Sequence, residues 1–456
     1  MNDSILFMTD SYKWTHWKQY PKGTSRVHSY LEARGGRYDK TVFFGLQYFI
    51  DKYLLNPVTH ADVNLAQMVS EQHLGPGHFN TEGWNYIVEE HGGKLPVNIW
   101  AMKEGSVNPV HTPLVVVENS DPKCFWLTNF LETLLVNIWY PCTVATQSFH
   151  CKNILKRYLE ETADDEALAG LGFKLHDFGA RGVTCPEQAG IGGCAHLTSF
   201  DGTDNLQAMM VAAEFYGDYY QHGKSIPASE HSTITSWGRS REVDAMRNML
   251  EQYPTGLVAC VSDSFDIFKA CDDLWGKQLK DAILARDGAL VIRPDSGPHD
   301  NLLMLLNILS HRFGSTVNSK GYKVLHPKVR LIQGDGINPT TMVQILEMLK
   351  TNGWSTDNLA FGSGGGLLQD MNRDTSKYAF KCSAIEVYGQ WRDVYKDPVT
   401  DPGKKSQRGL INREKMNLVY TNGIMLGEMR LQDVRDKLNT ASTDLETCTS
   451  SGAFSF

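Results

Sequence analysis

The chain has 456 residues, of which 41% are hydrophobic and 21% charged, as expected of an ordinary globular protein with room for two or three domains. Its net charge of -8 argues against bulk binding to nucleic acid. Local arginine and lysine residues can still bind an anionic small molecule.

Nine cysteines occur without a C-x-x-C pair or regular spacing, which favours reduced thiols in a cytosolic protein over a disulfide framework or structural zinc. The first ten residues carry neither the basic region nor the long apolar core of a signal peptide. The most hydrophobic stretch, Phe125–Tyr140, contains Asn129, Glu132 and Asn137, which indicates a buried helix rather than a membrane span. We therefore expect a cytoplasmic protein.

Residues 1–165 are expected to form a mixed α+β domain. Alternating polar and apolar residues predict strands at Arg26–Glu32, Val97–Lys103 and Leu114–Glu118. Pro122–Glu161 is predicted to be largely helical, with a break near Pro141. The stretch Glu160–Gly172 is first acidic and then rich in small residues, which is typical of a boundary between domains.

Residues 166–380 repeat a rhythm of strand, loop and helix. Strands are predicted at Phe173–Phe178, His196–Phe200, Leu257–Val261, Ala289–Ile292, Val329–Ile332 and Leu359–Phe361. Helices are predicted at Asn205–Tyr216, Ser240–Gln252, Ser264–Trp275, Asn301–Phe313 and Thr340–Lys350. Strands that alternate with helices form a parallel sheet, and this many units favour an α/β barrel over an open sheet. Residues 381–456 are strand-like and rich in turns, and we expect them to return to the N-terminal domain.

Three short segments at the ends of predicted strands carry the most chemical information. They are Ile292-Arg-Pro-Asp-Ser-Gly297, Ile332-Gln-Gly-Asp-Gly336 and Phe361-Gly-Ser-Gly-Gly-Gly366. Ligands of α/β proteins bind at the carboxyl ends of parallel strands. A glycine run there lets main-chain N–H groups approach a phosphate, and an aspartate can hold a ribose diol or Mg²⁺. The segments predict a phosphorylated sugar as ligand, although Arg293 and Asp295 could instead form a salt bridge that closes a turn.

Two earlier loops add candidate contacts. Arg181 lies in a loop of small residues, where its planar guanidinium could bind a diphosphate, and Phe178 could stack on a flat aromatic ligand. Asp204 could accept hydrogen bonds from an amide or amine. On the pattern alone, however, capping of the helix that follows Asp204 is the stronger interpretation.

His231 lies beside a run of small polar residues and is a candidate general base, phosphate ligand or phosphorylated nucleophile. Asp263 or Ser264 is expected to cap the next helix, whereas Asp266 could point into the mouth of the barrel. Arg373 follows the glycine run at a distance that suits the other end of a short helix or loop. A basic group lies further along the chain, although each member taken singly fits a solvated surface residue better: Lys381, Lys396, Lys404 and Lys405.

Several enzyme classes find no support in the sequence. The chain has no G-x-x-x-x-G-K-[ST], no G-x-G-x-x-G after a strand and no G-x-S-x-G, the motifs of P-loop NTPases, Rossmann dehydrogenases and serine hydrolases. The acidic strand with a Thr-Gly-Gly loop found in open-sheet phosphoribosyltransferases is also missing. A barrel lyase or isomerase would need a Schiff-base lysine or paired carboxylates, where this chain offers Arg, Asp and Gly.

Taken together, the motifs resemble those of the nicotinamide phosphoribosyltransferase family along nearly the whole chain. The matching stretches are Thr9-Asp-Ser-Tyr-Lys13, Phe44-Gly-Leu-Gln-Tyr48, Gly83-Trp-Asn-Tyr-Ile87, His176-Asp-Phe-Gly179, Gly202-Thr-Asp204, Glu230-His-Ser-Thr-Ile-Thr235, Ser262-Asp-Ser264, the three strand-end segments and Lys396-Asp-Pro398. The resemblance implies a homodimer whose fold is an irregular α/β barrel with a second, mixed β-rich domain built from the N- and C-terminal parts. It also implies the reaction of nicotinamide with 5-phosphoribosyl 1-diphosphate and Mg²⁺ to give nicotinamide mononucleotide and diphosphate in NAD salvage.

The resemblance also assigns roles to individual residues. Phe178 and Tyr12 of the partner subunit would enclose the pyridine ring, with Asp10 at the same shared site. Asp204 would accept from the carboxamide, and this overrides capping. The remaining roles are Arg181 and Arg293 for the base and diphosphate, Asp266 and Asp295 for ribose hydroxyls or the Mg²⁺ shell, Gly364, Gly365 and Arg373 for the 5′-phosphate, and His231 for phosphorylation by ATP. Further substrate contacts are predicted at Ser225, Ser262, Gly334, Asp335, Lys381, Lys396 and Lys404.

Two alternatives share some of these features. A nicotinate phosphoribosyltransferase would have the same fold, but Asp204 would repel an anionic base, which favours the amide. A signalling or scaffold protein without activity would not need the full set of ring, ribose and phosphate contacts. Ala180 and Ala379 depart from the family's pattern, which has an aromatic residue and a serine at these positions.

Overall fold

The computed structural model describes residues 3–400 and 404–449, and the side chains of 442–449 are excluded from the description. The chain divides into two compact units. Unit 1 comprises Met1–Thr146, Ala212–Tyr219 and Met371–Phe456, and unit 2 comprises Gln147–Val211 and Tyr220–Asp370. Both are mixed α/β structures, and each is described by itself.

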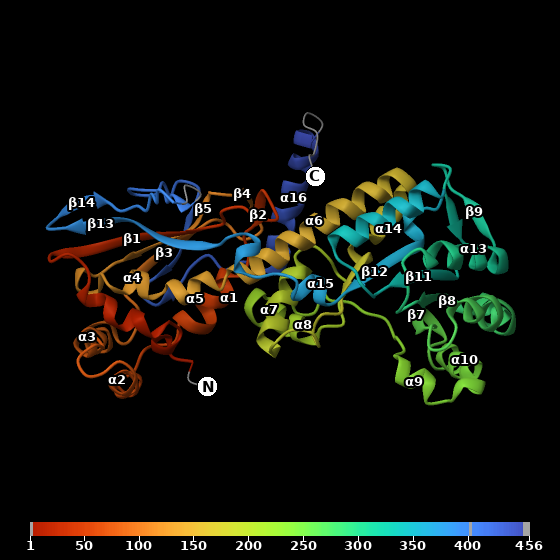
Figure 1. The fold of residues 1–456 in the computed structure, drawn as a ribbon, viewed down its shortest axis with the longest axis horizontal. Helices are drawn as coiled ribbons and strands as arrows, with labels where there is room; N and C mark the ends of the chain where they lie inside the picture. Colours follow the sequence, from red (N-terminus) through yellow and green to blue (C-terminus); the bar gives the residue numbers. More distant parts are fainter. Residues whose placement is uncertain (1–2, 401–403, 450–456) are drawn as a thin grey trace. The chain divides into compact units, whose positions relative to one another are not determined.

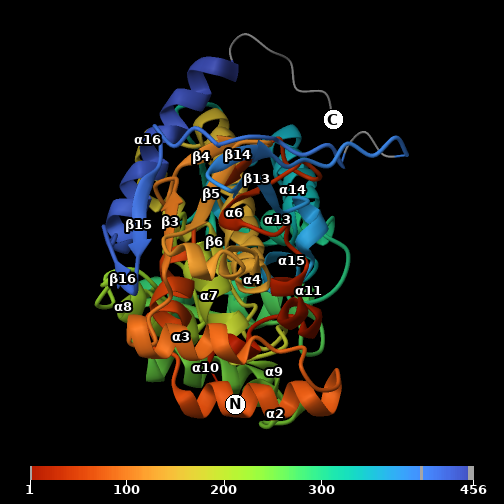
Figure 2. The ribbon, with the colours of Figure 1, turned by 90° about the vertical axis from the view of Figure 1, so that its left-hand side faces the viewer.

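Unit 1 is built on a seven-stranded sheet with the order β14-β13-β1-β5-β3-β15-β16. The strands are β1 Thr24–Glu32, β3 Val97–Ala101, β5 Pro113–Asn119, β13 Ala379–Val387, β14 Gln390–Asp393, β15 Asn417–Thr421 and β16 Ile424–Met425. β1 pairs antiparallel with β13 and with β5, and β15 lies antiparallel beside β3 (Figure 2). The N- and C-terminal parts of the chain therefore share one sheet, which confirms the predicted β-rich domain. A smaller sheet pairs β2 Lys40–Val42 with β4 Val107–Pro109.

The helices of unit 1 are mostly short. They are a 3₁₀ helix Ser11–Lys18, α1 Leu46–Phe49 with the π-helical turn Ile50–Leu54, α2 His60–His73, α3 Thr81–His91, α4 Leu127–Phe130, α5 Glu132–Val136 and α16 Leu431–Thr449. The predicted helical stretch after Pro122 is divided into α4, α5 and the long α6, Trp139–Thr162. The break predicted near Pro141 lies at Asn137 and Ile138, between α5 and α6. Pro141 falls within the first turn of α6, where its missing N–H would have no helical partner.

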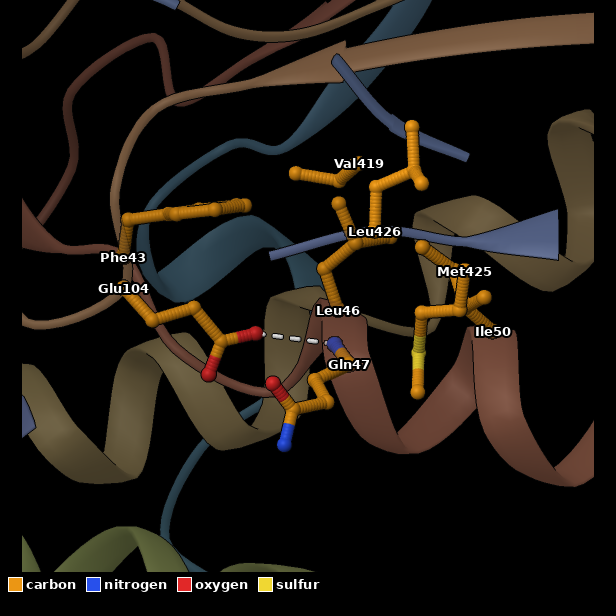
Figure 3. Close-up of a pocket in the computed structure, with 8 residues that line it drawn as sticks. All are labelled: Phe43, Leu46, Gln47, Ile50, Glu104, Val419, Met425 and Leu426. Atoms are coloured by element: carbon orange, nitrogen blue, oxygen red, sulfur yellow. Dashed lines mark hydrogen bonds between the residues drawn. The ribbon is translucent and has the colours of Figure 1, made fainter. Parts of the chain in front are cut away.

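A small cavity of about 30 Å³ lies at the start of α1 in unit 1 (Figure 3). The buried Glu104 carboxylate beside it accepts hydrogen bonds from the Gln47 N–H at 2.8 Å and from the Tyr216 hydroxyl at 2.9 Å. Burial raises the pKa of Glu104, and these hydrogen bonds oppose the shift. The cavity holds at most a water-sized molecule, so we do not assign it a ligand. The Glu104 carboxylate beside it instead satisfies the N–H of Gln47 in the first turn of α1.

Unit 2 contains five parallel strands in the order β6-β12-β11-β8-β7. They are β6 Leu175–Asp177, β7 Thr255–Val261, β8 Asp287–Arg293, β11 Val329–Gln333 and β12 Leu359–Ser363. Two short segments join the edges of this sheet through single bridges, Asp177 to Thr203, Gly202 to Lys224 and Ala228 to Ala259, all parallel. The ring that results is an irregular α/β barrel, as predicted.

Helices surround the barrel strands (Figure 1). They are α7 Pro186–Leu197, α8 Leu206–Tyr216, α9 His231–Thr235, α10 Glu242–Gln252, α11 Ile267–Lys269 with the π-helical Ala270–Gln278, α12 Lys280–Ala285, α13 Asn301–Phe313, α14 Pro339–Thr351 and α15 Gly365–Leu368; β9 Ser315–Val317 and β10 Lys323–Leu325 form a separate hairpin. The predicted strand His196–Phe200 is wrong, because these residues end α7 and follow it. All five are buried, so burial on every side removed the helical periodicity that would have identified them.

The limits of the two units differ from the predicted limits near residues 165 and 380. Cys151, Leu155, Tyr158 and Leu159 of α6 belong to the apolar core of unit 2, so the division falls within this helix rather than after it. At the other limit, the Tyr378 hydroxyl lies 2.6 Å from the Thr41 hydroxyl, within unit 1. Among the described residues, we find no helix with the length and apolar character needed to cross a membrane.

Candidate active site

A cavity of about 390 Å³ lies at the carboxyl ends of the barrel strands in unit 2. The loops after β6, β8, β11 and β12 line it, which is the ligand-binding edge of an α/β barrel. Eight predicted site residues meet there: Phe178, Arg181, Arg293, Asp295, Gly334, Asp335, Gly364 and Gly365. The structure therefore brings together the aromatic, cationic, acidic and glycine-rich elements that the sequence predicted separately.

Phe178 is held against glycine residues at the base of the cavity. Its main-chain N–H donates to the Ser363 carbonyl at 2.9 Å. A Cβ atom at Gly362 would lie only 2.0 Å from Phe178 Cε2, so no larger residue fits beneath the ring as it stands. At Gly334 the same ring would be 3.8 Å away, an ordinary contact. The ring thus has a defined place, with one edge against β12 and another side toward the cavity.

Arg293 ends β8 and faces Asp295 across the bend of the loop. The closest approach, from Arg293 Nη1 to Asp295 Oδ1, is 3.7 Å, and Nη2 donates to the Ser229 carbonyl at 3.4 Å. Both contacts are long, so the guanidinium keeps donors available for an anionic ligand. Arg181 is exposed at the same cavity and adds a second positive charge.

The loops after β11 and β12 line the cavity mostly with glycine. The residues are Gly334, Asp335, Gly336, Ile337, Asn338, Gly364, Gly365 and Gly366. A Cβ at Gly366 would lie 2.4 Å from the Ile337 carbonyl, so the two loops are in close contact. Asn338 caps α14, and Gly364 occupies the N-cap position of α15. Small residues at two helix N-termini suit a phosphate group, because bare N–H groups can approach it.

His231, the first residue of α9, contacts two carboxylates. Its Nε2 lies 3.0 Å from Asp263 Oδ1, and its Nδ1 lies 3.8 Å from Asp295 Oδ2. Asp263 also accepts from the Asp295 N–H at 3.0 Å and from the Ser296 hydroxyl at 2.6 Å. Burial raises the pKa of Asp263, but the hydrogen bonds from Ser296, His231 and Asp295 together bring it below its ordinary value. Asp263 is thus an ionised link between the histidine and the loop after β8.

The sequence offered Asp263 only as a helix cap, and the structure corrects this. Asp266 is the residue that caps α11, because its carboxylate accepts from the Lys269 N–H at 3.0 Å. Ser262 does not reach the cavity: it is fully buried, donates to the Cys260 carbonyl at 2.9 Å and accepts from Trp275 Nε1 at 3.0 Å. Two aspartates three residues apart can both fit a capping pattern, so only their contacts distinguish them.

Asp204 is not the cap of α8, contrary to the interpretation from the pattern alone. Asn205 occupies that position, with its side-chain oxygen 3.3 Å from the Ala208 N–H. Asp204 is exposed, and its carboxylate accepts a hydrogen bond from the Ser225 hydroxyl. Burial lowers the pKa of the neighbouring His176, while the Asp204 charge opposes the shift. Asp204 is therefore free of a capping role and available to a ligand.

The remaining predicted residues belong to unit 1, namely Asp10, Tyr12, Arg373, Lys381, Lys396 and Lys404. Tyr12 is 53% exposed, and Asp10 accepts from the Thr133 hydroxyl at 3.1 Å. Burial lowers the pKa of Lys381, and the Glu132 carboxylate opposes the shift. Three further cations lower the same pKa and so mark a basic cluster within unit 1: Arg34, Lys396 and Lys13. The sequence analysis did not identify Arg34 or Lys13 as candidate site residues. For Arg34, the signal available in the sequence was a basic residue next to the Gly35-Gly36 pair.

Among the described residues, a group in unit 1 has side chains of the kinds that bind metal ions, namely His91, Asp121 and Cys124. The Asp121 carboxylate already accepts from the Lys123 N–H at 2.8 Å, from Tyr86 at 2.9 Å and from His91 at 2.9 Å. Burial raises the pKa of the Cys124 thiol to about 12, which disfavours the thiolate that a metal needs. These contacts identify the group as a hydrogen-bonded cluster.

Comparisons with known proteins define the class of the molecule. Residues 173–427 match the model of the "Nicotinate phosphoribosyltransferase (NAPRTase) family", and residues 4–99 match that of the "Nicotinamide phosphoribosyltransferase, N-terminal domain". The chain belongs to this family of phosphoribosyltransferases.

Curated relatives extend the match over nearly the whole chain. The chain is 48% identical to the nicotinamide phosphoribosyltransferase of Xanthomonas campestris pv. campestris, over 96% of its own length and 99% of the relative's. It is 34% identical to the protein of the same name from Mycoplasma pneumoniae (91% and 97%) and 33% identical to that from Acinetobacter baylyi (94% and 96%).

Two solved structures share the fold at 14% sequence identity. Nicotinate-nucleotide pyrophosphorylase from Pyrococcus furiosus has a TM-score of 0.58 and covers 98% of this chain and 97% of its own. Human nicotinic acid phosphoribosyltransferase also has a TM-score of 0.58, with 95% and 93% covered. Both confirm the predicted fold class and carry no argument about substrate.

Proposed function

We propose that this chain transfers a phosphoribosyl group from 5-phosphoribosyl 1-diphosphate to nicotinamide, giving nicotinamide mononucleotide and diphosphate in NAD salvage. The observation that carries the proposal is the barrel cavity, which combines an aromatic ring, two arginines, three aspartates and bare glycine loops. The names of the relatives support the same reaction.

Phe178 and Asp204 would recognise the base. The ring of Phe178 would stack on the pyridine, an interaction worth about 0.5–1.5 kcal/mol beyond the area that it buries. The Asp204 carboxylate, oriented by the Ser225 hydroxyl, would accept from the carboxamide NH₂. Nicotinate carries a carboxylate at the same position and would be repelled by Asp204, so this residue favours the amide.

The cationic and glycine-rich sides of the cavity would bind the sugar diphosphate. Arg181 and Arg293 would hold the diphosphate, and Gly364 and Gly365 would admit the 5′-phosphate to main-chain N–H groups. As diphosphate leaves, oxocarbenium character develops at C1 of the ribose, and the pyridine nitrogen attacks there. Positioning and positive charge at the leaving group supply the catalysis, with Asp295 near the ribose hydroxyls.

Magnesium suits this site, because Asp295 and Asp335 bring oxygen donors to a cavity that would already hold a diphosphate. Asp295 would be the principal protein contact, since the Asp266 carboxylate already caps α11. When bound, the ion would neutralise charge on the diphosphate.

ATP would act through His231. The hydrogen bond between Nε2 and the ionised Asp263 holds the ring proton on Nε2, so the Nδ1 lone pair is left as a nucleophile. The imidazole is 45% exposed and is therefore accessible to a phosphate donor. Transfer of the γ-phosphoryl group to Nδ1 would release ADP, and later hydrolysis of the phosphohistidine would couple ATP to nucleotide formation.

A cytoplasmic homodimer would complete the site. Tyr12 of the partner subunit would cover the second face of the pyridine ring, with Asp10 of the partner subunit beside it. Helix α2 exposes Leu65, Met68 and Val69, three and four residues apart on one face, and such a face supports a contact between subunits. The resemblance to the family also assigns Arg373, Lys381, Lys396 and Lys404 to substrate binding, and their positive charge would suit the phosphates.

The first test is nucleotide formation from 5-phosphoribosyl 1-diphosphate and Mg²⁺, with nicotinamide or nicotinate as the base, each with and without ATP. We expect product with nicotinamide and none with nicotinate. A higher rate in the presence of ATP would support the role of His231. Preference for nicotinate would refute the role of Asp204. No product from either base would refute the reaction.

A further inference from the structure

Asp177, the last residue of β6, connects the two loops that would recognise the base. Its Oδ1 accepts from the Gly179 N–H at 2.7 Å, next to Phe178. Its carbonyl accepts from the Asp204 N–H at 3.0 Å. Its Oδ2 accepts from Asn205 Nδ2 at 2.9 Å, one residue beyond Asp204. A single residue therefore fixes the main chain beside both proposed contacts, the one with the pyridine ring and the one with the carboxamide.

The space around this carboxylate is closed. Asp177 is 0% exposed and Asn205 is 1% exposed. A Cβ at Gly193 of α7 would lie 2.5 Å from Asn205 Nδ2 and 2.9 Å from Asp177 Oδ2. The Asn205 amide also donates to the Ala189 carbonyl of α7 at 2.8 Å. Water has no room to replace a lost hydrogen bond, so the two loops depend on these groups for their position.

Stability alone does not account for a carboxylate at this place. Burial raises the pKa of Asp177 to about 6, and the hydrogen bonds from Asn205 and Gly179 offset only part of the shift. Removing a charge from water is costly, and a neutral residue of similar size would avoid this cost. What a carboxylate provides, and an amide does not, is two acceptor atoms for two N–H donors that point from different loops.

We propose that Asp177 is a positioning residue for the base-binding site, with Asn205 as its partner, and that it sets the distance between the Phe178 ring and the Asp204 carboxylate. The inference rests on the proposed function, because it concerns how nicotinamide would be held. It predicts that loss of the Asp177 carboxylate weakens binding of the base far more than binding of the sugar diphosphate. Of the predicted sugar diphosphate contacts in the cavity, Arg181 alone lies on the loop after β6, and the others lie on the loops after β8, β11 and β12.

The decisive variant is Asp177→Asn, which keeps the size but turns an NH₂ group toward either Gly179 N–H or the Asn205 amide. Asn205→Ala removes one connection and leaves the hydrogen bond to Gly179. Thr162→Val is the matched control for general stability. Thr162 is fully buried in unit 2, donates to the Tyr158 carbonyl at 2.7 Å and accepts from the Thr356 N–H at 3.0 Å, and it does not line the cavity.

Steady-state kinetics with each substrate varied in turn, together with thermal unfolding, tests the proposal on the full chain. Asp177→Asn should raise KM for nicotinamide about tenfold, as expected when a buried hydrogen bond is lost, and change KM for 5-phosphoribosyl 1-diphosphate by less than about twofold. Asn205→Ala should raise KM for nicotinamide by a smaller factor. If Asp177→Asn does not fold, the KM values of Asn205→Ala test the proposal in its place. Thr162→Val should lower the unfolding temperature without changing either KM.

An unchanged KM for nicotinamide in an active Asp177→Asn enzyme would overturn the inference alone. An equal rise of both KM values would also overturn it, because the residue would then be merely structural. A wild-type chain that forms no nucleotide would overturn the proposed function and, with it, this inference.

Discussion

Gly362→Ala tests whether the place of the Phe178 ring determines affinity for the base. Gly362 lies in β12, and its φ is outside the left-handed region, so the backbone accepts alanine. The new Cβ would lie 2.0 Å from Cε2 and 2.2 Å from Cδ2 of Phe178, whereas ordinary contact begins at 3.4 Å. The ring must therefore move by about 1.4 Å toward the cavity.

The magnitude follows from overpacking and lost stacking. An extra methyl group in a packed site costs about 1–3 kcal/mol of unfolding free energy, and the lower end applies here because Phe178 borders the cavity. Loss of ring stacking costs about 0.5–1.5 kcal/mol of binding, which corresponds to a rise in KM for nicotinamide of roughly 2- to 13-fold. KM for 5-phosphoribosyl 1-diphosphate should stay nearly constant.

Gly170→Ala is the matched control, since a Cβ at Gly170 would meet no other atom within 4 Å and Gly170 does not line the cavity. Initial rates with nicotinamide varied, combined with thermal unfolding, measure both variants. The control should change KM by less than about twofold. If Gly362→Ala leaves KM for nicotinamide unchanged, or if both variants raise it equally, Phe178 does not stack on the base and the argument fails.

Three further predictions concern charge, the shared site and ATP. Folding lowers the pKa of Asp263, so the stability that its carboxylate contributes is present above the unfolded pKa of about 3.9 and is lost as pH falls through the folded pKa. The unfolding free energy of wild type minus that of Asp263→Asn should therefore shrink on acidification. A difference that stays constant with pH would refute this. When inactive Tyr12→Ala and Arg293→Ala chains are mixed, unfolded and refolded together, about a quarter of wild-type activity should return if each active site contains residues of both subunits. No activity should return if each chain supplies all the residues of its own site. His231→Ala should abolish stimulation by ATP while keeping a slow ATP-independent transfer; retained stimulation would exclude the phosphohistidine.

Local sequence chemistry was sufficient for the core of the barrel and for the cavity. Ala289–Ile292, Val329–Ile332 and Leu359–Phe361 lie within β8, β11 and β12, because short apolar runs bounded by turn residues are typical of strands buried on both faces. The loops after these strands were identifiable because glycine and polar residues follow the apolar run of each strand. Phe178, Arg293, Asp295 and Gly364 therefore meet where the sequence placed them.

The assignment of caps was beyond the sequence. Asp204 and Asp263 fitted a capping pattern as well as Asn205 and Asp266 did, yet the latter two cap α8 and α11. A cap depends on one hydrogen bond whose geometry is set by the neighbouring strand. The strand predicted at His196–Phe200 failed for a related reason, because complete burial hides the periodicity on which the prediction depends.

What the sequence alone determined is the class of fold, the family and the residue types at the barrel mouth, because these depend on patterns within a few residues and on motifs in a fixed order. Only the tertiary structure decided that Asp177 joins two loops, that Ser262 faces inward and that β1 lies beside β13. Each of these depends on contacts between distant parts of the chain, whose burial and hydrogen-bond partners no local pattern specifies.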